Sequence, residues 1–173
     1  PLRSSVEGAE RLGRVRELAV RLRRLHWVHL SIGEFGEAYD LAKRTYELAR
    51  SADDAFDEAK SIMGMGQARL GQGLCGEAIA YLRRTLDKLK RVGDSHCEAE
   101  TLWLLGRAHC ESGQAGPARD LLMRALEMVR DIGDRDDEFR FLADLGRVEL
   151  TARRPDTALA YLNEATTIAR ELG

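Results

Sequence analysis

The chain has 173 residues, of which 44% are hydrophobic and 32% are charged, a composition typical of a folded helical protein and not of a disordered one. Its net charge of −2 gives no general attraction to nucleic acid, and no apolar run approaches the ~20 residues that a membrane span needs. The cysteines, Cys75, Cys97 and Cys110, match neither a disulfide framework nor a zinc spacing, which favours reduced thiols in a cytoplasmic protein.

Helical periodicity runs along most of the chain. In chain order, apolar residues three and four apart predict helices over residues 10–31, 35–50, 54–71, 75–91, 94–112, 115–131, 135–152 and 155–172. Glycines follow several of these stretches, at the position where a helix end favours a positive φ. Asp54, Asp94 and Asp134 stand where the third, fifth and seventh helices begin and are expected to cap them.

The same residue types recur every 40 positions. The repeated positions are Ala38, Ala78, Ala118 and Ala158, then Gly33, Gly73 and Gly113, and then Gly66, Gly106 and Gly146. Such a step, with two helices in each unit, indicates a helical repeat. Four repeats are predicted, over approximately residues 10–50, 54–91, 94–131 and 135–172, in a single domain over 1–173. Because the chain begins at Pro1 and not at methionine, we expect a fragment of a larger protein.

The repeats resemble the tetratricopeptide repeat (TPR) family. In that family a small residue of the first helix, and an alanine twelve residues later in the second, let the two helices cross closely. The corresponding pairs are Gly66 with Ala78, Gly106 with Ala118 and Gly146 with Ala158. His26 stands where the first repeat should have the glycine, and the step of 40 is longer than the usual ~34. The resemblance implies an all-α, right-handed TPR superhelix, an α-solenoid of four helix-turn-helix repeats.

Repeats of this longer step resemble two groups of TPR arrays. One group comprises the spindle-orientation adaptors of eukaryotes, and the other comprises the C-terminal arrays of large actinobacterial transcriptional regulators. The arginine-rich, lysine-poor composition and the run from Ile132 to Arg135 favour the second group.

The resemblance also implies where a partner would bind. In a TPR the first helix of each repeat lines a concave groove. The groove positions carry over to Arg23, Trp27, Lys60, Met63, Gln67, Glu100, Trp103, Arg107, Arg140 and Arg147. Both tryptophans of the chain are among them, and tryptophan and arginine most often carry binding energy. Basic members outnumber the single acidic one, so a partner with acidic side chains or a free carboxylate is expected. The alternative is that Trp103 packs between adjacent repeats and that the arginines are only solvated.

Other polar clusters show no catalytic or metal-binding pattern. The glycines between residues 64 and 76 lack the preceding strand that a phosphate-binding loop needs. Neither His26 with His29 nor the His-Cys steps at 96–97 and 109–110 have a zinc spacing. The acidic residues between 131 and 138 lack the order of a calcium loop. The sequence therefore predicts no enzyme, no cofactor and no metal.

We therefore expect a protein–protein interaction module, a TPR scaffold that binds a peptide or a partner domain within a multidomain transcriptional regulator. One alternative is a solenoid that senses a ligand or a signalling peptide. Another is an RNA-binding helical repeat, suggested by the basic first helix, although the rest of the chain is net acidic and nucleic acid is the less favoured partner. The last helix carries uncovered apolar residues such as Leu159 and Ile168, so we expect either that the parent protein continues the stack or that the chain forms a symmetric homodimer through that helix.

Overall fold

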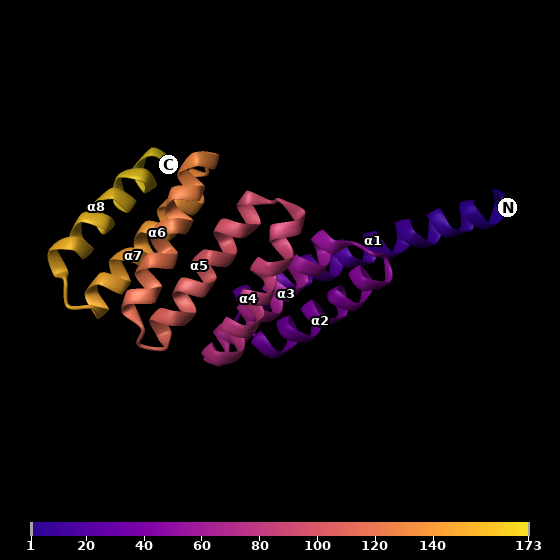
Figure 1. Ribbon diagram of the computed structural model, residues 1–173, viewed down its shortest axis with the longest axis horizontal. Helices are drawn as coiled ribbons and strands as arrows, with labels where there is room; N and C mark the ends of the chain where they lie inside the picture. Colours follow the sequence, from indigo (N-terminus) through magenta and orange to yellow (C-terminus); the bar gives the residue numbers. More distant parts are fainter. Residues whose placement is uncertain (1, 173) are drawn as a thin grey trace. The chain divides into compact units, whose positions relative to one another are not determined.

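The computed structural model describes the backbone of residues 2–172 and the side chains of residues 13–172. Within the described backbone the chain forms eight α-helices and no strand (Figure 1). The helices are α1 (Leu2–Ser31), α2 (Phe35–Ser51), α3 (Ala55–Gly71), α4 (Cys75–Val92), α5 (Ser95–Glu111), α6 (Ala115–Ile132), α7 (Arg135–Thr151) and α8 (Pro155–Leu172). The predicted all-α repeat fold is confirmed, and the last seven predicted ranges agree with α2–α8 to within one residue at each end.

The first helix begins earlier than the sequence predicted. The range 10–31 was wrong at its start, because α1 begins at Leu2. Residues 2–9 contain no proline, and Leu2, Val6 and Ala9 recur at steps of four and three residues, which is helical spacing. The sequence therefore already carries the signal for the earlier start, and the predicted range left it out.

The turns between helices recur at a nearly constant interval along the chain. Positive φ values occur at Gly33, Gly73, Gly93, Gly113 and Gly133, with φ between 74° and 81°, as predicted for glycines that follow helix ends. The same spacing places Asp53 and Arg153 in the left-handed region, with φ of 52° and 57°. A side chain in this conformation costs roughly 1–2 kcal/mol. These two positions escaped the sequence analysis because neither residue is a glycine.

The predicted caps of the first helices of the repeats are confirmed. The side chain of Asp54 accepts a hydrogen bond of 3.0 Å from the backbone N–H of Asp57. Asp94 accepts one of 2.7 Å from Cys97, and Asp134 accepts one of 3.0 Å from Asp137. Each cap satisfies one of the backbone N–H groups that a helix start leaves without a partner. Because these aspartates occupy equivalent positions of successive repeats, they begin each of these three helices at the same point of the repeat.

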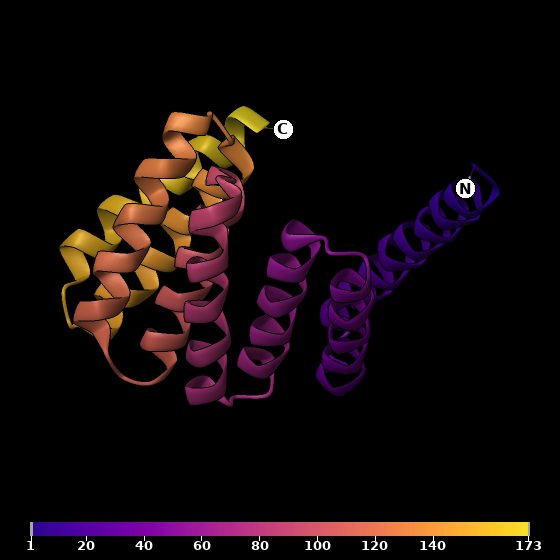
Figure 2. The ribbon, with the colours of Figure 1, turned by 45° about the vertical axis from the view of Figure 1, so that its right-hand side comes forward.

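The chain divides into two compact units, unit 1 (Pro1–Val92) and unit 2 (Gly93–Gly173). Unit 1 contains α1–α4 and unit 2 contains α5–α8, so each unit holds two of the predicted repeats. Within each unit consecutive helices lie side by side and antiparallel (Figures 1 and 2). In unit 1 the buried residues Ala42, Ile62 and Met65 form a core cluster that joins α2 to α3.

The close helix crossings predicted from the small residues are present in both units. Ala78, Ala118 and Ala158 are fully buried. A Cβ atom added to Gly66 would lie 3.0 Å from Cγ of Leu82, and one added to Gly106 would lie 2.7 Å from Cγ of Leu122. These distances leave no room for a side chain, so the glycines are required for the first and second helices of a repeat to pack.

In the first repeat, a histidine lies where α1 and α2 cross. His26 is buried, and its Nδ1 atom lies 2.8 Å from the carbonyl oxygen of Ala38. Because a carbonyl can only accept a hydrogen bond, Nδ1 carries the proton and donates it. Burial lowers the pKa of His26 below its ordinary value, against the opposing effect of the Ala38 hydrogen bond. The folded protein therefore holds His26 in its neutral form.

The buried His26 should make the protein less stable in acid. A histidine with a lowered pKa in the folded state binds fewer protons than the same histidine in the unfolded chain. Stability is therefore fully present above the ordinary histidine pKa of about 6.5 and is lost as the pH falls below it. Melting temperatures measured from pH 7.5 to about 5 should fall steadily for the wild type. The variant His26→Gln retains an N–H donor but does not titrate, so its decline should be shallower. Equal slopes for the two proteins would contradict the role of His26.

Candidate partner-binding surfaces

The ten predicted partner-binding residues fall in three rows along the first helices of the repeats, which are α1, α3, α5 and α7. We call them together the first-helix surface. The rows are Lys60, Glu100 and Arg140, then Arg23, Met63 and Trp103, and then Trp27, Gln67, Arg107 and Arg147. Members of a row occupy equivalent positions of successive repeats, and the rows follow one another at helical spacing, so in each helix they lie on one side. Their exposure differs from row to row.

Two members of the middle row are core residues. Trp103 is 4% exposed and Met63 is also buried, although both were predicted to face a partner. The indole of Trp103 stacks on the ring of Phe141, with centroids 5.4 Å apart and planes inclined by 15°. Its Nε1 donates a hydrogen bond of 2.7 Å to Oδ2 of Asp144. Because Phe141 and Asp144 both belong to α7, Trp103 joins α5 to α7 in unit 2, and its assignment as an exposed contact residue was wrong.

The arginines of unit 2 surround this tryptophan and are paired with acids. The guanidinium carbons of Arg140 and Arg107 lie 4.3 Å and 5.0 Å from the centre of the Trp103 ring. Arg147 approaches Oδ1 of Asp144 at 3.1 Å, and Arg140 pairs with Asp137. A partner carboxylate would therefore compete with acidic groups that are already in place.

Arg107 is held more loosely than its neighbours. Its Nε lies 3.7 Å from Oδ2 of Asp144, and its terminal nitrogen lies 3.9 Å from Glu111. Both distances exceed the length of a hydrogen bond. The buried Nε of Arg107 consequently has no hydrogen-bond acceptor among the described residues.

Unit 1 presents an exposed tryptophan in place of this cluster. Trp27 on α1 is 49% exposed. One turn earlier, Arg23 forms an ion pair with Asp57, which joins α1 to α3. On α3, the ammonium of Lys60 lies 5.0 Å from the centre of the Phe56 ring. Unit 1 therefore offers a broad apolar ring beside positive charge, the combination that is enriched at protein interfaces.

A shallow cleft opens beside these residues in unit 1. Its enclosed volume is only about 10 Å³, and it is lined in part by Arg23, His26 and Lys60. Pockets for small-molecule ligands usually measure ~300–1,000 Å³. The cleft is therefore too small to enclose such a ligand.

One cluster brings together residues that the sequence analysis had separated. Ligand atoms of His96, Asp134 and Asp137 lie within 4.8 Å of one another in unit 2. Asp134 caps α7 and Asp137 pairs with Arg140, so both carboxylates already have partners. Unit 1 contains an equivalent contact, because Arg16 lies 4.0 Å from Asp54 just as His96 lies 3.9 Å from Asp134. The repeat thus explains His96 as a polar contact between successive first helices.

None of the helices, as far as they are described, combines the length and the apolar character that a bilayer crossing requires.

In comparisons with known proteins, residues 57–131 match the family model of the tetratricopeptide repeat. None of the curated protein sequences matches the chain.

Three solved structures share the fold over most of this chain. A Rap protein complexed with Competence and Sporulation Factor has a TM-score of 0.84 and 11% identity, over 91% of this chain and 44% of that one. Aspartyl phosphate phosphatase F from Bacillus subtilis has a TM-score of 0.81 and 12% identity, over 92% and 42%. A signal transduction ATPase with numerous domains (STAND protein) with a tetratricopeptide repeat sensor, from Pyrococcus horikoshii, has a TM-score of 0.79 and 19% identity, over 94% and 25%. The chain spans less than half the length of each of these proteins.

The repeated helix pairs, with their glycine crossings and aspartate caps, define a helical-repeat protein. The family match and the shared fold agree with the resemblance seen in the sequence. Residues 57–131 match the tetratricopeptide repeat family, and the described chain has the all-α helical-repeat fold of the solved structures that it resembles.

Proposed function

We propose that the chain is a protein-interaction scaffold that binds a peptide or a partner domain through its first-helix surface. The observation that carries the proposal is the half-exposed Trp27, which lies one helical turn after Arg23 on α1 in unit 1. A tryptophan at such a position supplies a large apolar contact at a small entropic cost. The scaffold acts by binding and not by catalysis. The likeness to aspartyl phosphate phosphatase F, at 12% identity, extends to the fold alone.

The partner we propose carries an acidic side chain or a free carboxylate. Arg107 and Arg147 support this chemistry in unit 2. A guanidinium has five N–H donors, and the contact of Arg147 with Asp144 engages one of its nitrogens. Arg107 has no contact of hydrogen-bond length with the carboxylates beside it. Since Asp144 already offsets part of this positive charge, we expect the acidic group to tune affinity while an apolar anchor supplies most of it.

Within the cell we propose that this scaffold is the regulatory array of a cytoplasmic multidomain transcriptional regulator. The arginine-rich, lysine-poor composition supports this role. The STAND protein, whose TPR segment is a sensor, shows that the same fold occurs as a part of a longer signalling chain.

A signalling-peptide sensor is the second candidate. It is favoured by the Rap protein, which shares the fold over 91% of this chain and was solved in complex with Competence and Sporulation Factor. In that case the first-helix surface would bind a regulatory peptide, not a segment of an assembled partner. No observation on the described residues favours the RNA-binding alternative, because Arg16, Arg21 and Arg23 of α1 each contact an acidic group.

Trp27 and Arg147, the exposed first and last members of the third row, provide the test. Peptides should be selected on the protein from a random-peptide display library, and their affinities measured by calorimetry. Peptides that engage unit 1 should lose about thirtyfold or more in affinity with Trp27→Ala, the loss of a binding hot spot. Peptides that engage unit 2 should carry a carboxylate and should bind Arg147→Ala more weakly.

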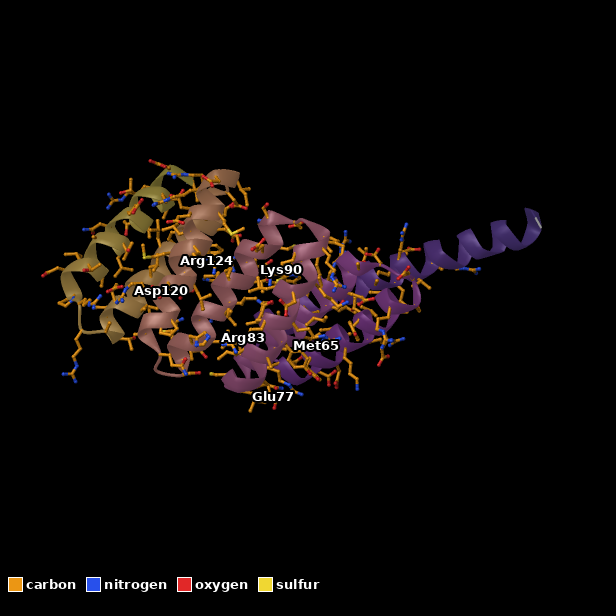
Figure 3. All side chains as sticks on the ribbon, in the orientation of Figure 1. Met65, Glu77, Arg83, Lys90, Asp120 and Arg124 are labelled. Carbon is orange, nitrogen blue, oxygen red and sulfur yellow. The ribbon has the colours of Figure 1, made fainter. Side chains whose placement is uncertain are left out.

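The control uses two exposed residues of a second helix, Met123 and Arg124 on α6; Figure 3 labels Arg124. The variants Met123→Ala and Arg124→Ala remove an apolar and a basic side chain outside the first-helix surface. Their affinities should equal that of the wild type. Equal losses in the control and test variants would place binding elsewhere and would overturn the proposal.

A further inference from the structure

One side of α1 exposes apolar residues in a row. Leu25 is 48% exposed and Val28 is 52% exposed, and Leu18 is exposed as well. Leu18 and Val28 lie seven positions before and three positions after Leu25, so the three residues lie on one side of the helix. We call them the α1 outer face. They are separate from Trp27, which lies on the opposite side of α1.

The repeat shows what normally covers this side of a first helix. Its step relates Leu25 to Met65 and Leu145, which are 4% and 0% exposed, and Val28 to Ala68 and Val148, which are fully buried. Met65 belongs to one buried cluster with Ala42 of α2, and Tyr39 and Tyr46 of the same helix pack against that cluster. In both units the side is covered by the preceding second helix, α2 against α3 and α6 against α7. The α1 outer face is therefore shaped to receive a second helix.

The last helix exposes the complementary side. Leu159 on α8 is 59% exposed, and the repeat relates it to Tyr39 and Arg119. The guanidinium carbon of Arg69 on α3 lies 3.7 Å from the centre of the Tyr39 ring, and Arg119 pairs with the buried Glu149 on α7. At these positions the second helix thus contacts the first helix that follows it. In α8 this position is apolar, and we call it, with the adjoining Leu162 and Ala169, the α8 outer face.

We propose that two copies of this chain stack head to tail, with α8 of one copy packed on α1 of the next. The contact continues the α2–α3 and α6–α7 interfaces by one more step, so the α8 outer face of one copy meets the α1 outer face of the next.

This contact differs from the symmetric dimer through the last helix that the sequence suggested. A symmetric dimer uses one surface twice, whereas the head-to-tail contact uses two different surfaces and leaves one of each open. The head-to-tail assembly therefore grows with protein concentration.

Sedimentation velocity on the whole chain tests the proposal with two variants, Leu25→Glu and Leu159→Glu. Both positions are exposed, so the melting temperature should stay close to that of the wild type. The wild type should form dimers and longer species as its concentration rises. Each variant alone should be monomeric, because each lacks one of the two surfaces in every copy. In an equal mixture, the intact α8 outer face of the Leu25→Glu variant can bind the intact α1 outer face of the Leu159→Glu variant. The mixture should therefore form a one-to-one dimer and nothing larger.

The control is Met123→Glu, which places the same charge at an exposed apolar position of α6 and should associate like the wild type. A wild type that remains monomeric at high concentration would overturn the proposal. A Leu25→Glu variant that still dimerises while Leu159→Glu does not would establish the symmetric dimer through α8 in its place. A mixture that remains monomeric would also exclude head-to-tail stacking.

Discussion

Replacing Gly106 with leucine should unfold unit 2. A Cβ atom at this position would lie 2.7 Å from Cγ of Leu122 and 3.1 Å from the backbone carbonyl oxygen of Ala118. The oxygen belongs to the backbone of α6 and cannot move aside without moving the helix. Overpacking of a core costs ~1–3 kcal/mol when side chains can adjust, and more when the obstacle is backbone. Since domains are stable by only about 5–15 kcal/mol, we expect a large fall in melting temperature.

The same substitution at Gly116 provides the control. Gly116 lies in α6, and a Cβ atom there would meet no atom within 4 Å. Leucine is a better helix former than glycine, so Gly116→Leu should leave the stability unchanged or raise it by up to about 1 kcal/mol. Thermal unfolding followed by circular dichroism separates the two variants. If Gly106→Leu melts with the wild type, the close crossing of α5 and α6 is wrong.

Trp103→Ala should cost about 3–5 kcal/mol of stability, the usual loss when a large buried ring is removed from a core. The ring is 4% exposed, stacks on Phe141 and donates a hydrogen bond to Asp144. Its removal leaves a cavity between α5 and α7 and takes away one hydrogen bond of a half-buried carboxylate. Urea unfolding at neutral pH measures the loss directly.

The matched substitution is Trp27→Ala, at the other tryptophan. Trp27 is 49% exposed, so its removal should change stability by only about 0.5 kcal/mol. Trp103→Phe then separates the two contributions at the buried site, because phenylalanine keeps a stacking ring but cannot donate to Asp144. We expect it to lose less stability than Trp103→Ala. Similar losses for Trp103→Ala and Trp27→Ala would show that Trp103 is not a core residue.

The arrangement of helices could be predicted from the sequence because its signals are local and repeated. Each helix start has an aspartate or another polar residue near it, most turns have a glycine at the left-handed position, and the constant repeat step confirms each signal several times. Asp53 and Arg153 adopt the same backbone conformation without a glycine, so the local signal was absent there. In these two turns the flanking helices determine the conformation, against the preference of the residue itself.

The burial of the candidate partner-binding residues could be predicted only in part. Helical spacing correctly placed them on one side of the first helices. It could not show that Trp103 is covered, because its contacts, Phe141 and Asp144, lie in the following repeat. The same position holds Arg23 in the first repeat and Met63 in the second. Three different residue types at one repeat position indicate that the side chain there packs against a different neighbour in each repeat. This variation was the available sign that Trp103 is a packing residue.

The regular spacing of the left-handed turns has a consequence for how such a chain can change in length over generations. Positive φ recurs at an even interval from Gly33 to Arg153, so each helix between these residues, together with its turn, spans the same number of residues. One inserted residue within a helix would rotate all the following side chains of that helix by about 100°. Recombination that adds or removes one whole repeat, in contrast, leaves every turn and every buried face in register. The number of repeats can therefore vary by unequal crossover without disturbing the packing within the repeats that remain.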